Sequence, residues 1–409
     1  MNQLDKFKKF IEDRNENVKV GLVGAGQMGQ GIIAQVAKMY GVELVCIIDR
    51  NQKQLDIAAN RYKKLKDNSL LCSDSITSLD NVELDIVIEA TGTPAAGALV
   101  AKNVLNRGIN LILLNVETEA TIGLALRKEA EQNGAIVTVA DGDEPVAALD
   151  LYDFATELSF EVISIGKGKN NPFNRFATPS SLKKEASLKK MNPKMLTSFV
   201  DGTKTMVEMT ALANFLDFNI DVDGMHGIEA TYENINQYYI PKKDGGLLDN
   251  SQVVDFAFGI APGVFAVIYS EDEYVNYEME YLKMGEGPYW TLARPYHLTS
   301  LEIPRTIRHI MLEKYSKLSA QSWNVEVVAY AKKDIEPGTN LGSIGGDYIY
   351  GKAQKISSSK GLLPIGIAED NVVTKAIAKG NPIAIEEVDA QDNELCEYWN
   401  YQNQILDSD

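Results

Sequence analysis

Three glycines near the start of the chain, Gly24, Gly26 and Gly29, stand in the spacing Gly-x-Gly-x-x-Gly. The apolar run 18–23 before them is typical of a buried strand, and residues 31–39 after them have a helical pattern. At such a turn the first glycine permits the tight bend, the second lets the backbone approach a pyrophosphate, and the third lets helix and strand pack closely. The helix N-terminus offers unpaired N–H groups to the phosphates. The spacing therefore predicts a dinucleotide site; the alternative is a glycine-rich turn that binds nothing.

An acid, Asp49, ends the second apolar run about twenty residues beyond the last of these glycines. Its carboxylate would accept hydrogen bonds from the ribose hydroxyls of adenosine and would repel a 2′-phosphate, which favours NAD. Arg50 beside it would pair with that phosphate or stack on adenine, so NAD and NADP both remain open. Further residues predicted to contact the cofactor follow the glycines or lie at the ends of later strands: Gln27, Met28, Thr91, Gly92, Asn115 and Glu117.

The candidates for catalysis are charged residues in the middle of the chain. Lys204 and Glu208 lie four residues apart in a predicted helix and so share one of its faces. When hydride reaches a carbonyl carbon, the oxygen needs a proton donor or a positive charge beside it, and Lys204 and Lys167 are the candidates. Asp201 and His297 are further candidates for catalytic roles. The structural alternatives are a solvated ion pair, a helix N-cap at Asp201 and a histidine satisfied within the fold.

A run of alternating glycine and lysine, Gly166-Lys167-Gly168-Lys169-Asn170, follows a predicted strand. In a strongly acidic chain, two lysines at this place indicate an anion such as a substrate phosphate or carboxylate, and the alternative is a flexible, solvated loop. Asp201, Glu208 and Glu229 carry oxygen atoms of the kind that Mg²⁺ or Mn²⁺ binds. Their spacing does not require a metal, so a divalent metal is left open and no metal ligand is assigned.

Strands and helices alternate through the first part of the chain, which is typical of a doubly wound parallel α/β sheet. We expect a Rossmann dinucleotide-binding domain over residues 1–150, an α+β domain for substrate binding and dimerisation over 151–322, and a small β-rich domain over 323–409. In the middle domain, a strand at 160–165 is expected to end in the glycine–lysine loop. The polar residues 172–197 are expected to be irregular and to form a lid.

The composition excludes some classes of function. The 409 residues carry a formal net charge of −17, which argues against nucleic-acid binding because that function requires a basic face. No segment has the length of a transmembrane helix, and the N-terminus lacks the apolar stretch of a signal peptide. The three cysteines, Cys46, Cys72 and Cys396, are few and scattered, which favours reduced thiols. We expect a cytoplasmic homo-oligomer that acts on a small molecule and does not bind membranes.

Three stretches together resemble the homoserine-dehydrogenase-like oxidoreductases: the nucleotide-binding region, the Gly166–Asn170 run and Asp201-Gly202-Thr203-Lys204. The C-terminal residues 331–338 and 362–368 are similar to a SAF domain. The pairing resembles a subgroup with a reductoisomerase-like enzyme of isoprenoid biosynthesis, which converts 1-deoxy-D-xylulose 5-phosphate to 2-C-methyl-D-erythritol 4-phosphate with NADPH. The resemblance implies an NAD(P)-dependent oxidoreductase that acts on a small polyol or its phosphate.

The chain departs from the pattern of homoserine dehydrogenase at two places. In that family a helix carries an acid and, four residues later, a catalytic lysine, whereas Lys204 stands at the acid's position here and Glu208 at the lysine's. A second lysine of that family follows an asparagine at a strand end, but Asn115 is followed by Val116 and Glu117. Both changes argue against homoserine as substrate. The alternatives are a homoserine-type dehydrogenase and a non-catalytic nucleotide-binding regulatory or scaffold protein.

Overall fold

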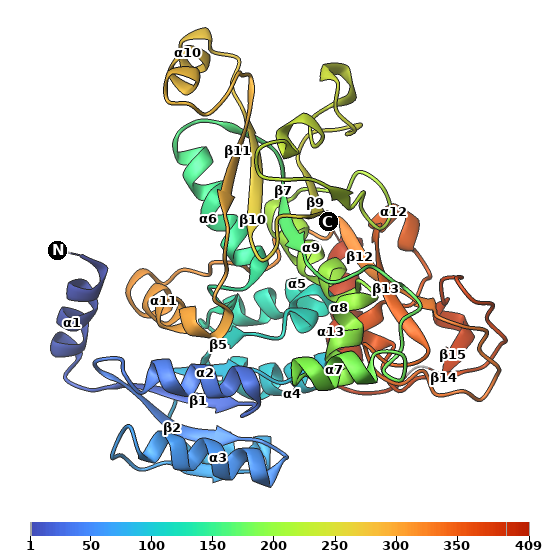
Figure 1. Ribbon diagram of the computed structural model, residues 1–409. Helices are drawn as coiled ribbons and strands as arrows, with labels where there is room; N and C mark the ends of the chain where they lie inside the picture. The colour runs from blue at the N-terminus through green and yellow to red at the C-terminus, as the bar shows by residue number, and fades with distance from the viewer. Residues whose placement is uncertain (1, 390, 409) are drawn as a thin grey trace. The chain divides into compact units, whose positions relative to one another are not determined.

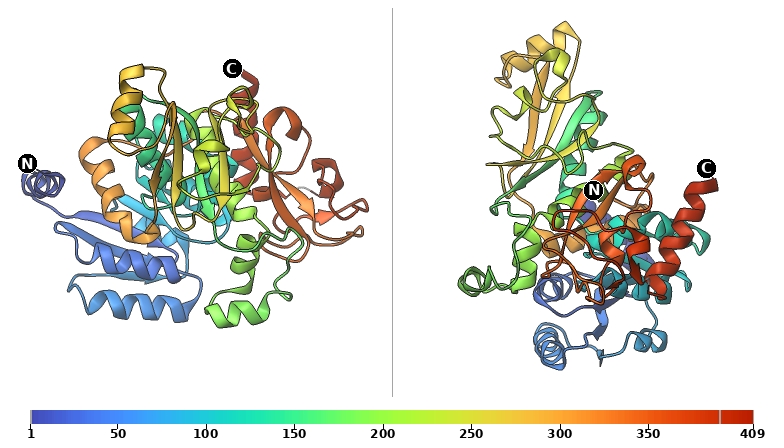
Figure 2. Two further views of the ribbon diagram at one scale, coloured as in Figure 1. Left: turned by 45° about the horizontal axis from the view of Figure 1, so that its top comes forward. Right: turned by 90° about the vertical axis from the view of Figure 1, so that its right-hand side faces the viewer.

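The computed structural model describes residues 2–389 and 391–408, and the chain forms two compact units (Figure 1, Figure 2). The first unit consists of Met1–Asp143, Leu298–Ala320 and Asp392–Asp409, and the second of Glu144–His297 and Gln321–Gln391. Within the described ranges, no helix is both long and apolar enough to cross a bilayer.

The first unit is built on a parallel sheet of six strands in the order β3-β2-β1-β4-β5-β6, which confirms the predicted doubly wound fold. The last residue of β1, Val23, pairs with Ile48 on one side and with Glu89 on the other. The glycine turn, Asp49 and the loop after Glu89 therefore lie at the same edge of the sheet, where open α/β sheets bind ligands. The strands are β1 Val18–Val23, β2 Val42–Ile48, β3 Leu71–Ser73, β4 Ile86–Glu89, β5 Asn110–Leu113 and β6 Val137–Val139.

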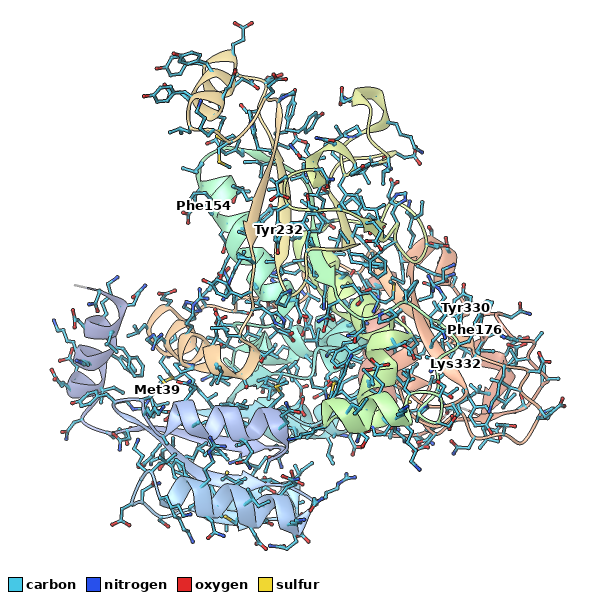
Figure 3. All side chains as sticks on the ribbon, in the orientation of Figure 1. Met39, Phe154, Phe176, Tyr232, Tyr330 and Lys332 are labelled. Atoms are coloured by element: carbon cyan, nitrogen blue, oxygen red, sulfur yellow. The ribbon has the colours of Figure 1, made fainter. Side chains whose placement is uncertain are left out.

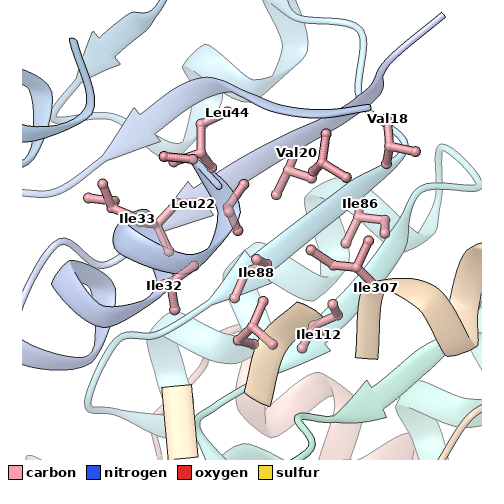
Figure 4. Close-up of a cluster of buried hydrophobic side chains, with 14 of the residues drawn as sticks. Val18, Val20, Leu22, Ile32, Ile33, Leu44, Ile86, Ile88, Ile112 and Ile307 are labelled. Atoms are coloured by element: carbon pink, nitrogen blue, oxygen red, sulfur yellow. The ribbon is translucent and has the colours of Figure 1, made fainter. Parts of the chain in front are cut away.

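Apolar side chains of these strands pack against helices to form the core of the first unit (Figure 4). Val20, Leu22 and Ile88 come from adjacent strands, and Ile32 comes from α2; all four are fully buried. Ile307 joins this core from a distant part of the sequence, which explains why residues 298–320 belong to this unit. The helices are α1 Gln3–Arg14, α2 Gln27–Val36, α3 Gln52–Lys63, η1 Ile76–Asn81, α4 Pro94–Leu105, α5 Val116–Gln132, η4 Thr299–Glu302, α11 Ile303–Arg308, η5 His309–Glu313 and α13 Glu394–Ser408.

The C-terminal helix α13 also returns to the first unit. Helix α5 is interrupted at Ile122, where φ is −138° and ψ is 15°. Gln402 of α13 compensates, because its Nε2 donates to the Thr121 carbonyl at 3.1 Å and its Oε1 accepts from the Ala125 N–H at 3.4 Å. Side-chain bonds of this kind satisfy backbone groups that a break in a helix leaves unpaired. The compact units thus differ from the sequence-based boundary, which placed all of residues 323–409 in one domain.

The second unit contains a mixed sheet of five strands in the order β11-β10-β7-β9-β8. Strands β7, β9 and β8 run parallel to one another, and β10 runs antiparallel to both of its neighbours, β7 and β11. Helices α6 and α9 pack on this sheet. The strands are β7 Glu161–Lys169, β8 Ile228–Glu229, β9 Val253–Phe258, β10 Val264–Tyr269 and β11 Tyr289–Arg294. The helices of this segment are α6 Glu144–Glu157, α7 Lys183–Lys189, α8 Pro193–Val200, α9 Thr203–Leu216, η2 Ile235–Gln237, η3 Lys242–Asp244 and α10 Glu273–Tyr281.

Two local predictions in this unit were wrong. The glycine–lysine run is the end of β7 and not a loop, because its glycines face neighbouring backbone: a Cβ at Gly166 would lie 1.7 Å from the Asp255 carbonyl oxygen, and one at Gly168 2.4 Å from the Ala261 nitrogen. Residues 172–197 are not irregular throughout, since they contain α7 and the start of α8.

Residues 321–391 are rich in short strands, as predicted, and they pack on α9. Asn214 of α9 accepts hydrogen bonds through its Oδ1 from the N–H groups of Asn324 and Val325, at 2.9 and 3.0 Å. The segment contains β12 Val325–Ala331, β13 Ile349–Lys355, α12 Ile356–Ser359, η6 Ile365–Ile367, β14 Val372–Val373, η7 Ile385–Glu387 and β15 Val388–Asp389. Its membership of the SAF fold stays a prediction.

Candidate active site

The glycine turn has the geometry that its sequence predicts. Gly24 has φ +99°, and a Cβ there would lie 2.5 Å from the Ala90 carbonyl oxygen. A Cβ at Gly29 would lie 2.2 Å from the Gly24 carbonyl oxygen, so the third glycine is needed for close packing of α2. Gly26 is different: it begins α2, its φ is −66°, and nothing lies within 4 Å of the position of a Cβ. The open space beside Gly26 and the unpaired N–H groups of the helix fit a pyrophosphate.

Asp49 is engaged with this turn. Its Oδ2 accepts a hydrogen bond from the Ala25 N–H at 2.7 Å, and its Oδ1 accepts one from the Asn51 N–H at 2.8 Å. The carboxylate therefore holds the glycine turn in place, a role that the sequence pattern did not indicate. Its predicted contact with the ribose hydroxyls stays a prediction.

A hollow of about 360 Å³ opens beside Arg50. Its other walls come from the loop after β3 and from α4, and its lining residues are Arg50, Asp74, Ser75, Ile76, Thr77, Leu99, Lys102 and Asn103. It combines cations, hydroxyl groups and the apolar side chains of Ile76 and Leu99, which fits an adenosine. Sequence reasoning missed all of these residues except Arg50, although β3 follows β2 in the sheet and so brings its loop beside Asp49.

The loops after β4 and β5 form one hydrogen-bonded group. Thr91 donates to Glu89 Oε1 through its N–H at 2.7 Å and through its hydroxyl. Asn115 begins α5 and donates through Nδ2 to the Thr93 carbonyl at 2.7 Å. Gly92 has open space where a Cβ would lie, and Glu117 lies in the first turn of α5. Gln27 and Met28, which are also predicted to contact the cofactor, are exposed and lie in the first turn of α2.

Glu89 is a buried carboxyl that sequence reasoning did not select. It is 0% exposed, and its Oε2 has no hydrogen-bond partner. Burial raises the pKa of Glu89 to about 7, although the bonds from Thr91 oppose the rise. A carboxyl that changes its charge near neutral pH thus lies at the cofactor edge of the sheet.

In the second unit, the predicted catalytic residues Lys167, Lys204 and Glu208 do lie together. Lys167 Nζ is 2.6 Å from Glu144 Oε1 and also contacts Glu208 Oε2. Lys204 Nζ is 3.8 Å from Glu208 Oε1, and His297 Nε2 is 3.5 Å from Glu144 Oε1. One cluster therefore joins Glu144 of α6, Lys167 of β7, Lys204 and Glu208 of α9, and His297, which follows β11. Glu144 was not predicted.

The two lysines of β7 have opposite properties. Burial alone would lower the pKa of Lys167, but the carboxylates of Glu144 and Glu208 outweigh it and hold that pKa above its ordinary value. Burial and the nearby charge of Lys167 lower the pKa of Lys169 to about 8. Burial, together with Glu144, raises the pKa of Glu208. Lys167 is therefore a fixed cation, whereas Lys169 can exchange a proton near neutral pH.

Lys169 borders a pocket of about 630 Å³ at the C-terminal ends of β7, β8 and β9. The pocket contains a cation, an acid, two amides and two aromatic rings, and its lining residues are Lys169, Asn170, Asn171, Pro172, Phe173, Glu229, Phe258, Gly259 and Ala261. The sequence indicated Glu229 only as a metal ligand and indicated Lys169 and Asn170 only as part of an anion-binding run. The rest of this wall could not be predicted, because the pocket is assembled from three separate segments of the chain.

The remaining candidates hold structural contacts. Asp201 is 0% exposed, and its Oδ2 lies 2.8 Å from Lys332 Nζ. Asp201 and Glu208 are thus each bound to lysine, so a divalent metal at either would have to displace an ammonium group. Of the other histidines, His226 pairs with Asp221 at 2.9 Å, and His309 contacts Asp141 at 3.2 Å.

Two family models match the chain, one in each functional region. Residues 24–140 match the NAD-binding domain of homoserine dehydrogenase, and residues 142–303 match the catalytic domain of oxidoreductase DRL. Both matched models describe oxidoreductases, one an NAD-binding domain and the other a catalytic domain. The predicted resemblance to the homoserine-dehydrogenase-like enzymes and the predicted NAD or NADP cofactor are confirmed. No curated protein is significantly similar to the chain in sequence.

Several solved structures are similar to this chain. The WlbA dehydrogenase from Chromobacterium violaceum, in complex with NADH and UDP-GlcNAcA, is 18% identical with a TM-score of 0.33; the match covers 41% of this chain and 47% of that one. A myo-inositol dehydrogenase from Corynebacterium glutamicum is 14% identical with a TM-score of 0.40, over 68% and 75%. A DOX-P reductoisomerase in complex with NADPH, fosmidomycin and magnesium is 16% identical with a TM-score of 0.35, over 49% and 59%. The chain thus spans about half the length of the first of these structures.

Proposed function

We propose that this chain is an NAD(P)-dependent oxidoreductase that acts on a small polyol or its phosphate, as a reductoisomerase of the deoxyxylulose phosphate type that reduces a carbonyl group. The observation that carries the proposal is the pocket of about 630 Å³ at the strand ends of the segment that matches the DRL catalytic domain. Asn170, Asn171 and Glu229 offer amide and carboxylate groups to hydroxyls, and Phe173 and Phe258 offer apolar faces to carbon atoms.

Formation of 2-C-methyl-D-erythritol 4-phosphate requires two changes. The C3–C4 bond of the substrate breaks while a C2–C4 bond forms, which gives a branched aldehyde, and one hydride and one proton then add across the carbonyl group of that aldehyde. NADPH or NADH would supply the hydride, and a side chain would supply the proton. Lys169 fits the proton donor, because it borders the pocket and its pKa is lowered to about 8. Lys167 fits a fixed positive charge that stabilises the developing oxyanion, since its two carboxylate neighbours keep it protonated. Lys204, close to Glu208, is expected to add to the same positive field.

The alternatives differ in what they predict. A homoserine-type dehydrogenase is supported by the match of residues 24–140 but not by the catalytic segment, which matches a different model and reverses the positions of Lys204 and Glu208. A non-catalytic nucleotide-binding protein would bind NAD(P) and show no turnover that depends on Lys169.

The test is a turnover assay with NADPH and NADH on 1-deoxy-D-xylulose 5-phosphate, with added Mg²⁺ or Mn²⁺ and without it, and with aspartate semialdehyde as the homoserine-type substrate. We expect cofactor oxidation with the sugar phosphate and formation of 2-C-methyl-D-erythritol 4-phosphate. Lys169→Met should lower kcat by about 10²–10⁴-fold, the usual size of general acid catalysis. The matched control is Lys184→Met, since Lys184 is exposed on α7. Turnover of aspartate semialdehyde alone, or equal effects of the two variants, would contradict the proposal.

Three further expectations belong to the same proposal: a SAF fold for the C-terminal segment, a homodimer and a place in isoprenoid biosynthesis in the cytoplasm. Sedimentation equilibrium of the full chain tests the homodimer directly. A mass equal to that of one chain at all concentrations would exclude it.

A further inference from the structure

Arg175 lies between two aromatic rings of different segments. Its guanidinium carbon is 4.8 Å from the centre of the Phe173 ring and 5.6 Å from the centre of the Tyr350 ring. The Tyr350 ring in turn stacks on Tyr330 at 5.5 Å and meets Phe176 edge-on at 6.0 Å. Figure 3 labels Tyr330 and Phe176, which lie close together at this place. Aromatic faces hold a cation in a fixed position without neutralising its charge.

A second cation, Lys352 of β13, converges on the same place. A Cβ at Gly224 would lie 2.9 Å from Lys352 Cε and 3.1 Å from Arg175 Nη2, so both cations border one point. Lys352 Nζ also lies over the Tyr330 ring at 5.4 Å. In the part of the chain that the structure describes, no ion pair joins Arg175 or Lys352 to a carboxylate.

Among the described residues, neither cation forms an ion pair with a carboxylate, although Arg175 shares a side-chain hydrogen bond with Tyr350. Arg175 Nη1 is buried and has no hydrogen-bond partner, although an unpaired buried donor is costly. Burial lowers the pKa of Arg175, and burial together with Arg175 lowers the pKa of Lys352. The carboxylate of Asp201 acts on Arg175 only from a distance and is already paired with Lys332, and Asp223 acts on Lys352 without forming an ion pair. These two adjacent cations lie in a chain whose formal net charge is −17.

We propose that Arg175 and Lys352 form an anion subsite that binds the phosphate group of the substrate. Phe173 connects this subsite to the catalytic pocket, because its ring contacts Arg175 and also lines the pocket beside Lys169. The identity of the substrate rests on the proposed function. The subsite adds that the phosphate of this substrate contacts two residues, neither of which any sequence motif indicates. It also gives the C-terminal segment a role, since Lys352 and Tyr350 come from β13.

The first test measures the binding of inorganic phosphate to the full chain by calorimetry, with wild type, Arg175→Met and Lys352→Met. A charge-assisted bidentate contact is strong, so we expect the dissociation constant to rise at least about tenfold in Arg175→Met. Arg175→Lys keeps the positive charge but loses the planar guanidinium, so its dissociation constant for phosphate should lie between those of wild type and Arg175→Met. The matched control is Lys333→Met, which removes a cation over Tyr348 at 4.0 Å in the same segment. Thermal midpoints exclude unfolding as the cause. Unchanged binding in folded Arg175→Met and Lys352→Met, or an equal loss in Lys333→Met, would overturn the subsite.

The second test asks whether the subsite receives the substrate's own phosphate or a separate anion. Inorganic phosphate should inhibit turnover of 1-deoxy-D-xylulose 5-phosphate competitively, and Arg175→Met should raise KM while kcat changes little. Inhibition that is not competitive would show a separate anion site and would overturn the assignment. If wild type does not turn over this substrate but phosphate binding still depends on Arg175, the proposed function fails and the anion subsite stands.

Discussion

Lys332 Nζ lies 2.8 Å from Asp201 Oδ2, and the two side chains are 1% and 0% exposed. Lys332 also donates to the Gly346 carbonyl at 2.8 Å, and Asp201 Oδ1 accepts from the Thr203 N–H at 2.9 Å. The pair therefore joins the segment 321–391 to the first turn of α9, the helix that carries Lys204 and Glu208.

Breaking this buried pair should destabilise the second unit strongly. Asp201→Asn or Lys332→Met leaves one buried charge without its partner, and we expect a loss of about 3–5 kcal/mol in the free energy of unfolding. The double variant should lose less than the sum of the two, because no isolated charge remains. Urea denaturation followed by tryptophan fluorescence measures this. If the losses simply add, the two residues do not act as a pair.

The glycine turn could be predicted from the sequence because its geometry is local. The spacing of Gly24, Gly26 and Gly29 and the strand before them determine the turn, and parallel strand order follows from the alternation of elements. The partner of Asp201 could not be predicted, because Lys332 is far away in the sequence and nothing in either segment marks the contact. For the same reason the sequence did not show that Ile307 and Gln402 return to the first unit.

The candidate site was predicted in part. Lys167, Lys204 and Glu208 were chosen for their residue types and spacing, and the structure brings them together. The sequence predicts Lys169 only as part of an anion-binding loop. Its lowered pKa could not be predicted, because it depends on the residues packed around Lys169 in the fold.

The second prediction separates the roles of two glycines. Gly26→Val should abolish or greatly weaken binding of NADPH and NADH while leaving the thermal midpoint nearly unchanged, because the new side chain enters the open space beside α2. Gly24→Ala should instead lower the thermal midpoint, since φ is +99° and the backbone of Ala90 occupies the space. Calorimetric titration and thermal denaturation of both variants test this. Tight cofactor binding by Gly26→Val would refute the role of Gly26.

The third prediction concerns Lys169 and pH. Because its pKa is lowered from 10.5 to about 8, the amine is protonated below about pH 8 and neutral above it. The kcat of carbonyl reduction should therefore fall above about pH 8, and the kcat of alcohol oxidation should rise over the same range. Stability should rise between about pH 8 and 10.5, where only the unfolded chain keeps this proton. Lys169→Met should remove the stability change, and a persistent change would assign it to another group.

The fourth prediction concerns Glu89, whose pKa is raised from 4.5 to about 7. Between these values the folded chain binds the proton and the unfolded chain does not, so stability should fall as pH rises from about 4.5 to 7. Glu89→Gln keeps an oxygen that can accept from Thr91 and should remove this fall. The control is Glu157→Gln at an exposed position on α6. Denaturation midpoints at pH 5, 6, 7 and 8 distinguish the variants, and parallel curves for wild type and Glu89→Gln would refute the assignment.

The most direct test of hydride transfer to a small phosphorylated carbonyl compound uses NADPH deuterated at C4 of the nicotinamide. Each of the two C4-deuterated epimers is incubated with the full chain and 1-deoxy-D-xylulose 5-phosphate, and the product is examined by mass spectrometry and NMR. The account predicts that one epimer, and not the other, places a single deuterium on the carbinol carbon formed in 2-C-methyl-D-erythritol 4-phosphate. Bound NADPH that transfers deuterium to no carbon of the sugar phosphate would contradict it.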